Sequence, residues 1–418
     1  MQLFRDLEGV REQTREIHRK MGLGYNEAQV TPARQPSRFR SKMVSAQLFP
    51  GVEAIHALAN DWEALVGDSY TRSFAQPAWH LAAIDAFPRR DIAVAAAREN
   101  GRLLGVLPFC RIPTDARGLY FTLIGPPGRG DYQPLVADSQ RAPDALPAML
   151  EAAFRHYGKR GVYWFPNIPA TDPALPVLRS FFKANRMPFV EERESGPRLR
   201  LNGADFPVVE ASWSANHRYD VRRKRKRLAS RGPVTLWQPS SIEEARPVLD
   251  DFFRVHDQKW LAQGFPGMFQ DPANRRFFQS ILTRMWDRGA HFSTVRCGPV
   301  DVSYHFGFLS GGWIQWYRPS YRPEYAAYSP SKVHVAMLIE EACRNRWNGF
   351  DFLLGAEDYK ASWCNEEFEV VNIYAGFHPW SPAYFWFSRG KPFVRSKLQL
   401  TYLRARTWMQ RIRQRSPQ

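Results

Sequence analysis

One strand–helix–strand stretch late in the chain constrains the fold more than any other feature. WIQWYR (313–318) and FDFLL (350–354) are apolar and aromatic runs with the length and composition of strands. Between them, SPSKVHVAMLIEEACRNR (329–346) has helical periodicity, and its opening Ser-Pro pair is typical of a helix start. Two strands of one sheet that are joined through a helix run parallel. The stretch therefore predicts a parallel crossover.

The elements before this crossover predict antiparallel pairing. Helical patterns at 242–264 and 272–289 are followed by the strand-like segments 291–297 and 300–309. The turn SGG then joins the second of these to WIQWYR as a hairpin. A mixed, mainly antiparallel sheet flanked by helices is therefore expected, in an α/β (α+β) fold.

The first half of the chain repeats this theme less completely, so we expect two domains in tandem. A chain of 418 residues is long enough for two domains, each with its own core. The predicted division is a flexible basic leader at 1–43, an N-terminal domain at 44–204, a C-terminal domain at 205–387 and a basic amphipathic tail at 388–418. The segment 194–206 is interpreted as the passage between the domains.

The net charge of +17 is concentrated in a few places. Residues 388–418 hold nine Lys or Arg and no acid, and residues 218–231 hold eight basic residues and one Asp. This placement indicates local contacts with anions and argues against a uniformly basic coat for DNA. The tail mixes its basic residues with Leu and Trp, as helices that lie on anionic membranes do; docking on the protein body is the alternative.

Other whole-chain features point to the cytoplasm, with peripheral contact to the inner face of a membrane. The four cysteines have neither metal-ligand nor disulfide-framework spacing, which fits a reducing compartment and predicts no metal. No apolar run approaches the length of about 20 residues that spans a bilayer. The charged N-terminus does not contain a signal-peptide apolar stretch.

Four segments of the second half resemble a known family. HRYDVRRKRKRLASRG, VSYHFGF, YRPSYRPEYAAYSPSK and FDFLLGAEDYKASW are similar to the CelD-like branch of the GNAT acyltransferases, a bacterial group associated with polysaccharide biosynthesis and related to the tandem-GNAT Fem-type (FemAB-like) peptidyltransferases. The resemblance is strong over 205–377, weaker over 44–200 and absent in both tails. It implies two GNAT-like domains, of which the first is a degenerate copy.

The resemblance implies where an acyl-CoA donor, with acetyl-CoA preferred, would bind. A helix start has free N–H groups and a partial positive charge, and in a GNAT fold the start of the crossover helix holds the diphosphate of coenzyme A. Ser329, Ser331 and Lys332 are the candidates here, with an ordinary capped helix as the alternative. The family usually has Ser-Pro-Gly where this chain has Ser-Pro-Ser. Backbone donors near Tyr317 would stabilise the oxyanion.

The catalytic candidates come partly from chemistry and partly from the resemblance. Lys360 could stabilise developing negative charge, and Fem-type relatives use a Lys in the matching aromatic-Lys pair, which makes Tyr359 its companion. His305, within the strand VSYHFGF, is a candidate base or substrate contact, with a buried structural His as its rival. His256 and Trp260 lie four residues apart on one expected helix face, as in the family. Asp351 is either a substrate contact or a local cap.

The remaining candidates would hold an acceptor. Arg222, Arg223 and Lys226 lie on an expected helix and are suited to a phosphate-bearing substrate, although a solvated charged face is the common meaning of such runs. Tyr328 belongs to a cluster of tyrosines that either packs or forms a lid over a sugar or acyl group.

Together these features predict an acyl-CoA-dependent N- or O-acyltransferase that acts on a sugar or a cell-envelope precursor by direct attack on the thioester. The first alternative is a Fem-type transferase that uses aminoacyl-tRNA; tRNA binding is possible but not favoured. The second alternative is a non-catalytic GNAT-fold scaffold of a polysaccharide-synthesis complex, to which the missing glycine points.

Overall fold

The computed structural model describes residues 44–87, 89–112, 120–123, 130–159, 161–355 and 357–377. The predicted leader and tail lie outside these residues. The strands are β1 (Ser45–Pro50), β2 (Arg90–Glu99), β3 (Arg102–Ile112), β4 (Tyr120–Leu123), β5 (Val162–Pro169), β6 (Phe189–Arg200), β7 (Val234–Trp237), β8 (Ala290–Cys297), β9 (Val300–Ser310), β10 (Trp313–Tyr321), β11 (Gly349–Asp351) and β12 (Glu366–Gly376).

Helices flank these strands throughout the described residues. The α-helices are α2 (Glu53–Val66), α3 (Arg72–Ala75), α4 (Pro77–Ala86), α5 (Ala142–Tyr157), α6 (Leu175–Ala184), α7 (Phe206–Ser212), α8 (Ala215–Ala229), α9 (Ile242–Ala262), α10 (Pro272–Met285), α11 (Pro330–Arg344) and α12 (Asp358–Ala361). Three 3₁₀ turns are η1 (Met268–Gln270), η2 (Trp286–Arg288) and η3 (Pro323–Tyr328).

All described strands join into one mixed sheet, in the order β1-β2-β3-β4-β5-β12-β6-β11-β10-β9-β8-β7. The pairs β4–β5 and β10–β11 are parallel, whereas the other pairs in this order are antiparallel. The predicted α/β class, with a mixed and mainly antiparallel sheet, is therefore confirmed. The crossover from β10 through α11 to β11 is the parallel unit that the sequence predicted.

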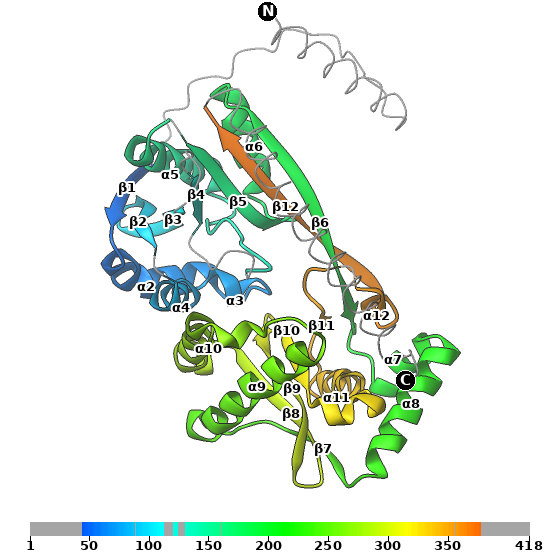
Figure 1. Ribbon diagram of the computed structural model, residues 1–418. Coiled ribbons are helices and arrows are strands. Elements are labelled where there is room, and N and C mark those ends of the chain that lie inside the picture. Colours follow the sequence, from blue (N-terminus) through cyan, green and yellow to red (C-terminus); the bar gives the residue numbers. More distant parts are fainter. Residues whose placement is uncertain are drawn as a thin grey trace, which may run out of the picture. The chain divides into compact units, whose positions relative to one another are not determined.

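The centre of the sheet differs from the sequence-based interpretation. Residues 194–206 were expected to be a passage between domains, yet most of them belong to the long strand β6. Figure 1 shows β6 beside β12, with which it pairs from Phe189 to Arg198. On its other edge β12 pairs with β5, so a strand from the second half of the chain lies between two strands of the first half, β5 and β6. The predicted division at 204/205 stays a proposal.

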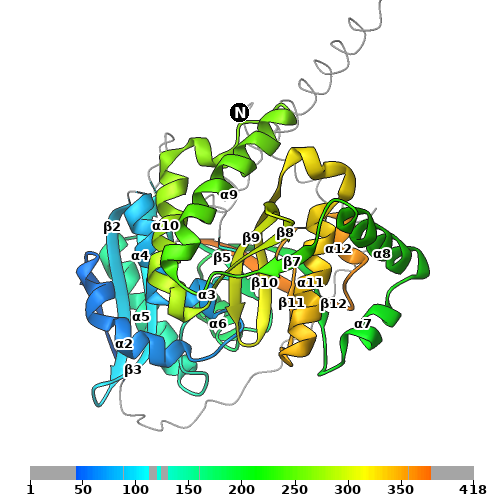
Figure 2. The same ribbon diagram turned by 90° about the horizontal axis from the view of Figure 1, so that it is seen from below.

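Two layers of helices cover opposite faces of β8–β11. Phe252 of α9 and Phe278 of α10 pack with Phe306 and Tyr317 in one apolar cluster. Helix α11 packs against Ile314, Trp316 and Phe350 in another. Because side chains alternate between the faces of a strand, neighbouring residues of β10 contact different helix layers. Figure 2 shows α9 and α10 on one side of these strands, and α11 with α8 on the other.

Local signals explain where the helices beside the site begin. The Ser241 hydroxyl accepts a hydrogen bond from the Glu244 amide at 3.2 Å and starts α9. Asp271 accepts one from the Ala273 amide at 2.9 Å, and Pro272 occupies the first position of α10. Each cap satisfies an amide that the helix itself leaves without a partner, so these starts follow from the sequence.

Candidate active site

The strands β10 and β11 separate after a short parallel pairing. They pair only through Trp313–Gln315 and Gly349–Asp351, after which each chain takes its own course. On its other side β10 shifts register against β9 between Gln315 and Arg318. Such a bulge leaves peptide groups outside the regular ladder. The parallel crossover therefore opens the sheet at Trp316 and Tyr317, between the two helix layers.

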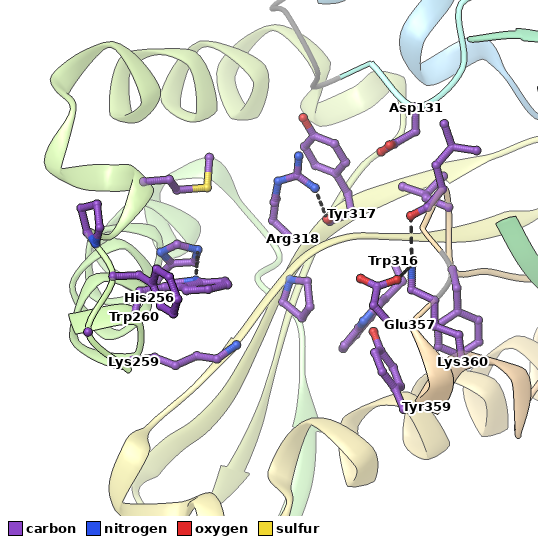
Figure 3. A pocket seen from close by; sticks show the side chains of 18 residues that line it. Asp131, His256, Lys259, Trp260, Trp316, Tyr317, Arg318, Glu357, Tyr359 and Lys360 are labelled. Atoms are coloured by element: carbon purple, nitrogen blue, oxygen red, sulfur yellow. Dashed lines mark hydrogen bonds and ion pairs between the residues drawn. The ribbon is translucent and has the colours of Figure 1, made fainter. Parts of the chain in front are cut away.

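A cavity of about 940 Å³ occupies this opening. Side chains from both faces of the sheet line it, together with the end of α9 and the turn before α12 (Figure 3). Its lining is Asp131, His256, Lys259, Trp260, Gly264, Phe265, Pro266, Met268, Trp316, Tyr317, Arg318, Pro319, Phe352, Leu353, Leu354, Glu357, Tyr359 and Lys360. The cavity is thus mainly apolar and aromatic, with a small set of ionisable groups, as is usual for small-molecule sites.

Five residues singled out from the sequence line this one cavity: His256, Trp260, Tyr317, Tyr359 and Lys360. They come from α9, β10 and α12, which are far apart in the chain. Figure 3 shows Lys360 and Tyr359 on one side of the cavity and His256 with Trp260 on the other. The fold therefore brings together residues that the sequence could only nominate one at a time.

Lys360 is almost fully buried, and its ammonium group is held by internal acceptors. It donates to the carbonyl oxygens of Leu354 and Gly355 at 3.0 and 3.2 Å, and lies 2.6 Å from a carboxylate oxygen of Glu357. Leu353, just before these acceptors, has a left-handed backbone with φ of 58°. The ammonium thus stabilises a strained turn in the cavity wall while keeping its charge beside the cavity.

His256 is held as a neutral side chain. The Trp260 indole donates to Nε2 of His256 at 3.0 Å, so this nitrogen is an acceptor and Nδ1 carries the proton. Burial, followed by the positive charges of Lys259 and Arg318, lowers the pKa of His256 to about 3. Because its acceptor nitrogen is already engaged, we interpret His256 as a wall of the cavity that positions Trp260.

Asp131 is an ionisable residue of the cavity that the sequence reasoning missed. It lies in the first half of the chain and is partly buried at the cavity wall. Burial raises its pKa to about 6, against the opposing charges of Arg318 and Lys360. The available signal was an Asp in a loop rich in Gly and Pro, IGPPGRGDYQPL, since such loops often carry functional groups.

Asp351 is buried and does not line the cavity. The Tyr132 hydroxyl is 2.8 and 3.0 Å from its two carboxylate oxygens, and the Leu353 amide donates to it at 2.8 Å. Burial raises the pKa of Asp351 to about 6. Asp351 therefore ties the first half of the chain to the cavity turn, in agreement with the local role left open by the sequence.

His305 differs from its predicted role as a base that faces the cleft. Its side chain is completely buried outside the cavity lining. Nε2 is 3.1 Å from the carbonyl oxygen of Gln315, and the ring stacks on Trp316 with centroids 4.5 Å apart. A Cβ at Gly307 would overlap both the His305 ring and the Gln315 carbonyl. His305 thus holds the bulge of β10 from behind.

The start of α11 also differs in detail from the prediction. Ser329 has a left-handed backbone with φ of 50°, and its side chain makes no capping hydrogen bond within the described residues. Ser331 lacks a positive φ, so its backbone conformation does not require glycine. Lys332 forms an ion pair with Asp220 of α8 at 2.7 Å. Ser329, Ser331 and Lys332 do not line the cavity described above.

The basic helix α8 is separate from the cavity lining. Arg222 pairs with Glu210 at 2.7 Å and Arg223 with Asp220 at 2.8 Å, while Lys226 is exposed. Tyr328 lies in η3, where the guanidinium of Arg227 is 5.6 Å from its ring centroid. The structure therefore does not bring Arg222, Arg223, Lys226 and Tyr328 together with the catalytic candidates.

Among the residues that the structure describes, no helix is both long and apolar enough to cross a membrane. Within the same residues, no cluster of three or more His, Cys, Asp or Glu side chains could hold a metal ion.

Comparison with known protein families indicates which class of protein this fold and site resemble. Residues 215–361 match the acetyltransferase (GNAT) domain family. This range contains β10, α11, β11 and Lys360, and therefore most of the cavity wall. This part of the chain is thus similar to a GNAT acetyltransferase domain. No curated protein matches the chain.

The solved structure of FemX extends the likeness in fold beyond that domain. The crystal structure of FemX has 12% sequence identity and a TM-score of 0.53, covering 72% of this chain and 91% of FemX. A conserved protein of unknown function from Bacteroides thetaiotaomicron has 11% sequence identity and a TM-score of 0.49, and the match covers 78% of this chain and 97% of that protein. A tandem GNAT protein from the clavulanic acid biosynthesis pathway has 14% sequence identity and a TM-score of 0.42, and the match covers 80% of this chain and 99% of that protein. At this identity the likeness to FemX concerns the fold alone.

Proposed function

We propose that this protein transfers an acyl group, acetyl in the simplest case, from an acyl-CoA to an amine or hydroxyl of a sugar or cell-envelope precursor. The observation that carries the proposal is the cavity at the separation of β10 and β11, open to both helix layers and lined by Asp131 and Lys360. The CelD-like resemblance of residues 205–377 supports a polysaccharide or envelope acceptor, handled in the cytoplasm.

The fit to an acyl-CoA rests on the shape of this opening. The pantetheine arm would lie along the free edge of β10, where the bulge at Trp316 and Tyr317 interrupts the ladder. Peptide N–H groups released from pairing are suitable donors for an oxyanion. The diphosphate would lie at the start of α11, near Ser329 and Ser331, with Lys332 reorganised from its pair with Asp220.

The reaction needs one base, one oxyanion donor and one group that meets the departing sulfur. Asp131 takes a proton from the acceptor nucleophile as this attacks the thioester carbonyl, and the new C–N or C–O bond forms as the C–S bond breaks. The thiolate leaves and takes a proton from the Tyr359 hydroxyl, which recovers one from solvent. A carboxylate whose pKa is about 6 is ionised at pH 7 yet basic enough for this task. The Lys360 charge stabilises the negative charge that develops.

The Fem-type alternative has one supporting observation, the surplus of basic side chains on α8. Residues 218–231 carry eight basic groups, of which Arg222, Arg223 and Arg225 have carboxylate partners. If aminoacyl-tRNA were the donor, tRNA would bind this surface and the affinity would fall steeply with salt.

A ligand panel separates the alternatives. We expect acetyl-CoA to raise the melting temperature of the full chain, since a ligand that binds only the native state stabilises it by about 2.7 kcal/mol at 100 times its Kd. Longer acyl-CoAs and tRNA are tested in the same way. Stabilisation by tRNA alone would support the Fem-type transferase, and no stabilisation by any acyl-CoA or by tRNA would support the scaffold. Transfer of labelled acetyl to glucosamine-type acceptors then tests the activity itself.

A further inference from the structure

Two cations of the cavity lack a carboxylate partner. Lys259 of α9 and Arg318 of β10 both line the cavity. Across the described residues, no carboxylate oxygen lies within 4.0 Å of the nitrogens of either side chain. Lysines nearby behave differently, because Lys332 pairs with Asp220 at 2.7 Å and Lys360 with Glu357 at 2.6 Å.

Aromatic faces hold both cations in place. The Lys259 ammonium is 4.9 Å from the ring centroid of Tyr321 and 5.4 Å from that of Trp260. The Arg318 guanidinium is 4.3 Å from the Tyr317 centroid and donates one N–H to the Tyr317 carbonyl at 2.9 Å. Cation–π contacts orient a charge without neutralising it. The remaining donors of Arg318 are thus left for a ligand, in the fork geometry that suits phosphate and carboxylate groups.

The charges of the cavity as a whole are consistent with an anionic ligand group. Burial lowers the pKa of Lys259, so its charge is costly in this wall unless an anion joins it. The carboxylates of the cavity are Asp131, which interacts with the charge of Arg318 at a distance beyond an ion pair, and Glu357, which pairs with Lys360. His256 beside them is neutral and contributes no charge. A ligand that brings one or two negative charges would balance Lys259 and Arg318.

From these contacts we infer that Lys259 and Arg318 form a subsite for an anionic group, a phosphate or a carboxylate, on the acceptor. This inference rests on the proposed acyltransferase function. The acceptor is favoured over the donor because α9, which carries Lys259, packs on the face of the sheet opposite α11. The expected diphosphate site of the donor is at α11. The apolar surfaces of Trp260, Phe265 and Met268 would then contact the less polar part of the acceptor.

Inorganic pyrophosphate and malonate serve as probes of the subsite in the full chain, at ionic strength matched with sodium chloride. We expect either anion to raise the melting temperature of the native protein with saturation. Lys259→Met and Arg318→Met should each weaken the apparent affinity at least tenfold. Lys226→Met on α8 is the matched control, since it removes one positive charge outside the cavity and should leave the response unchanged. Circular dichroism verifies that the variants fold.

Three results would overturn the inference: no saturable response of the native protein, an equal response in both cavity variants, or an equal loss in the control. The affinity for acetyl-CoA is measured on the same variants and should stay within twofold of the native value in Lys259→Met. A parallel loss of acetyl-CoA affinity would assign the subsite to the donor and contradict the acceptor assignment. If the native protein binds the probe anions through Lys259 and Arg318 but no acyl-CoA, the proposed function fails while the anion subsite stands.

Discussion

Asp131 and His305 show how burial and position change the pKa of an ionisable group and its access to the cavity. His305 would ordinarily titrate near neutral pH, but burial lowers its pKa well below that range and its ring packs behind the bulge. Asp131 would ordinarily be a weak base, but burial raises its pKa to about 6 at the cavity wall. His305, a candidate base of the sequence analysis, therefore lies outside the cavity lining, and in the proposed mechanism Asp131 acts as the base instead.

These two roles predict different pH profiles of kcat/KM. Because Asp131 acts when deprotonated, activity should fall about tenfold per pH unit below about pH 6 and level off above it. Asp131→Asn should lower kcat/KM by about 10²–10³-fold and remove this limb. His305→Phe keeps a ring against Trp316 but leaves the Gln315 carbonyl without its donor; it should lower kcat several-fold and keep the limb. If the fall in kcat/KM at low pH disappears in His305→Phe and persists in Asp131→Asn, the two assignments are reversed.

Strand β6 can lie close to the cavity wall because one of its residues, Gly196, has no side chain. A Cβ on Gly196 would overlap the carbonyl oxygen of Leu353, so the strand and the turn that follows β11 can approach only at this glycine. That turn supplies Leu354 and Gly355 as acceptors for Lys360. The position of Lys360 therefore depends on an element about 160 residues earlier in the chain.

Gly196→Ala should consequently damage both stability and activity. The added methyl must displace backbone, not the end of a flexible side chain, so we expect the free energy of unfolding to fall by about 2–3 kcal/mol. Acyl transfer should fall further than the folded fraction does, because the turn that holds Lys360 moves. Urea unfolding and labelled acetyl transfer measure the two effects, with Ser195→Ala as the neighbouring control. An alanine variant with parental stability and turnover would show that the turn tolerates the shift.

Taken across the described fold, stability depends on imidazoles that are buried without charge. His291 of β8, His305 of β9 and His334 of α11 lie together, and His334 is within hydrogen-bond distance of Ser293 and Ser303. Both ring nitrogens of His291 lack a hydrogen-bond partner among the described residues. Burial lowers the pKa of His291 to about 4 and that of His334 to about 3. These groups stay neutral in the folded protein at pH values where an unfolded chain protonates them.

The sign of the resulting pH dependence follows from linkage. A His with a lowered folded pKa contributes full stability above its unfolded value of about 6.5, and this contribution is lost as the pH falls toward 4. Each such histidine should remove about 2 kcal/mol between pH 7 and pH 5. Asp131 and Asp351, whose pKa values are raised, act in the opposite sense over the same range. A difference between variants therefore isolates the histidine contribution.

His291→Phe tests this contribution directly. The phenyl ring fills a similar volume and removes two buried nitrogens without partners, so the variant should be as stable as the parent or up to about 2 kcal/mol more stable at pH 7. Its advantage should grow by about 2 kcal/mol at pH 5. Urea unfolding at both pH values measures the difference. An advantage that does not change with pH would mean that His291 stays neutral in the unfolded state as well, or that it protonates in the folded one.

Much of the local structure could be predicted because it depends on neighbours in the sequence. The crossover from β10 to β11 was expected from periodicity and from the Ser-Pro helix start, and the hairpin of β9 and β10 from its glycine turn. Tyr317, Tyr359 and Lys360 were nominated from the family resemblance and from their places beside these strands, and all three line the cavity. Their proximity follows once a parallel unit is known, since both strands end at the same edge.

What sequence reasoning missed depends on contacts between distant segments. Tyr132 reaches Asp351 across 219 positions, and β12 inserts between β5 and β6. No local pattern encodes such a pairing, because strands of similar composition could pair in several orders with similar hydrogen bonding. The approach of Asp131 to the cavity, and the burial that separates its pKa from that of His305, arise only when those strands are in place. Periodicity and caps thus predicted the elements, and the family resemblance predicted the chemical class. Long-range packing placed Asp131 at the cavity, His305 behind the bulge, and Lys259 and Arg318 in the cavity wall.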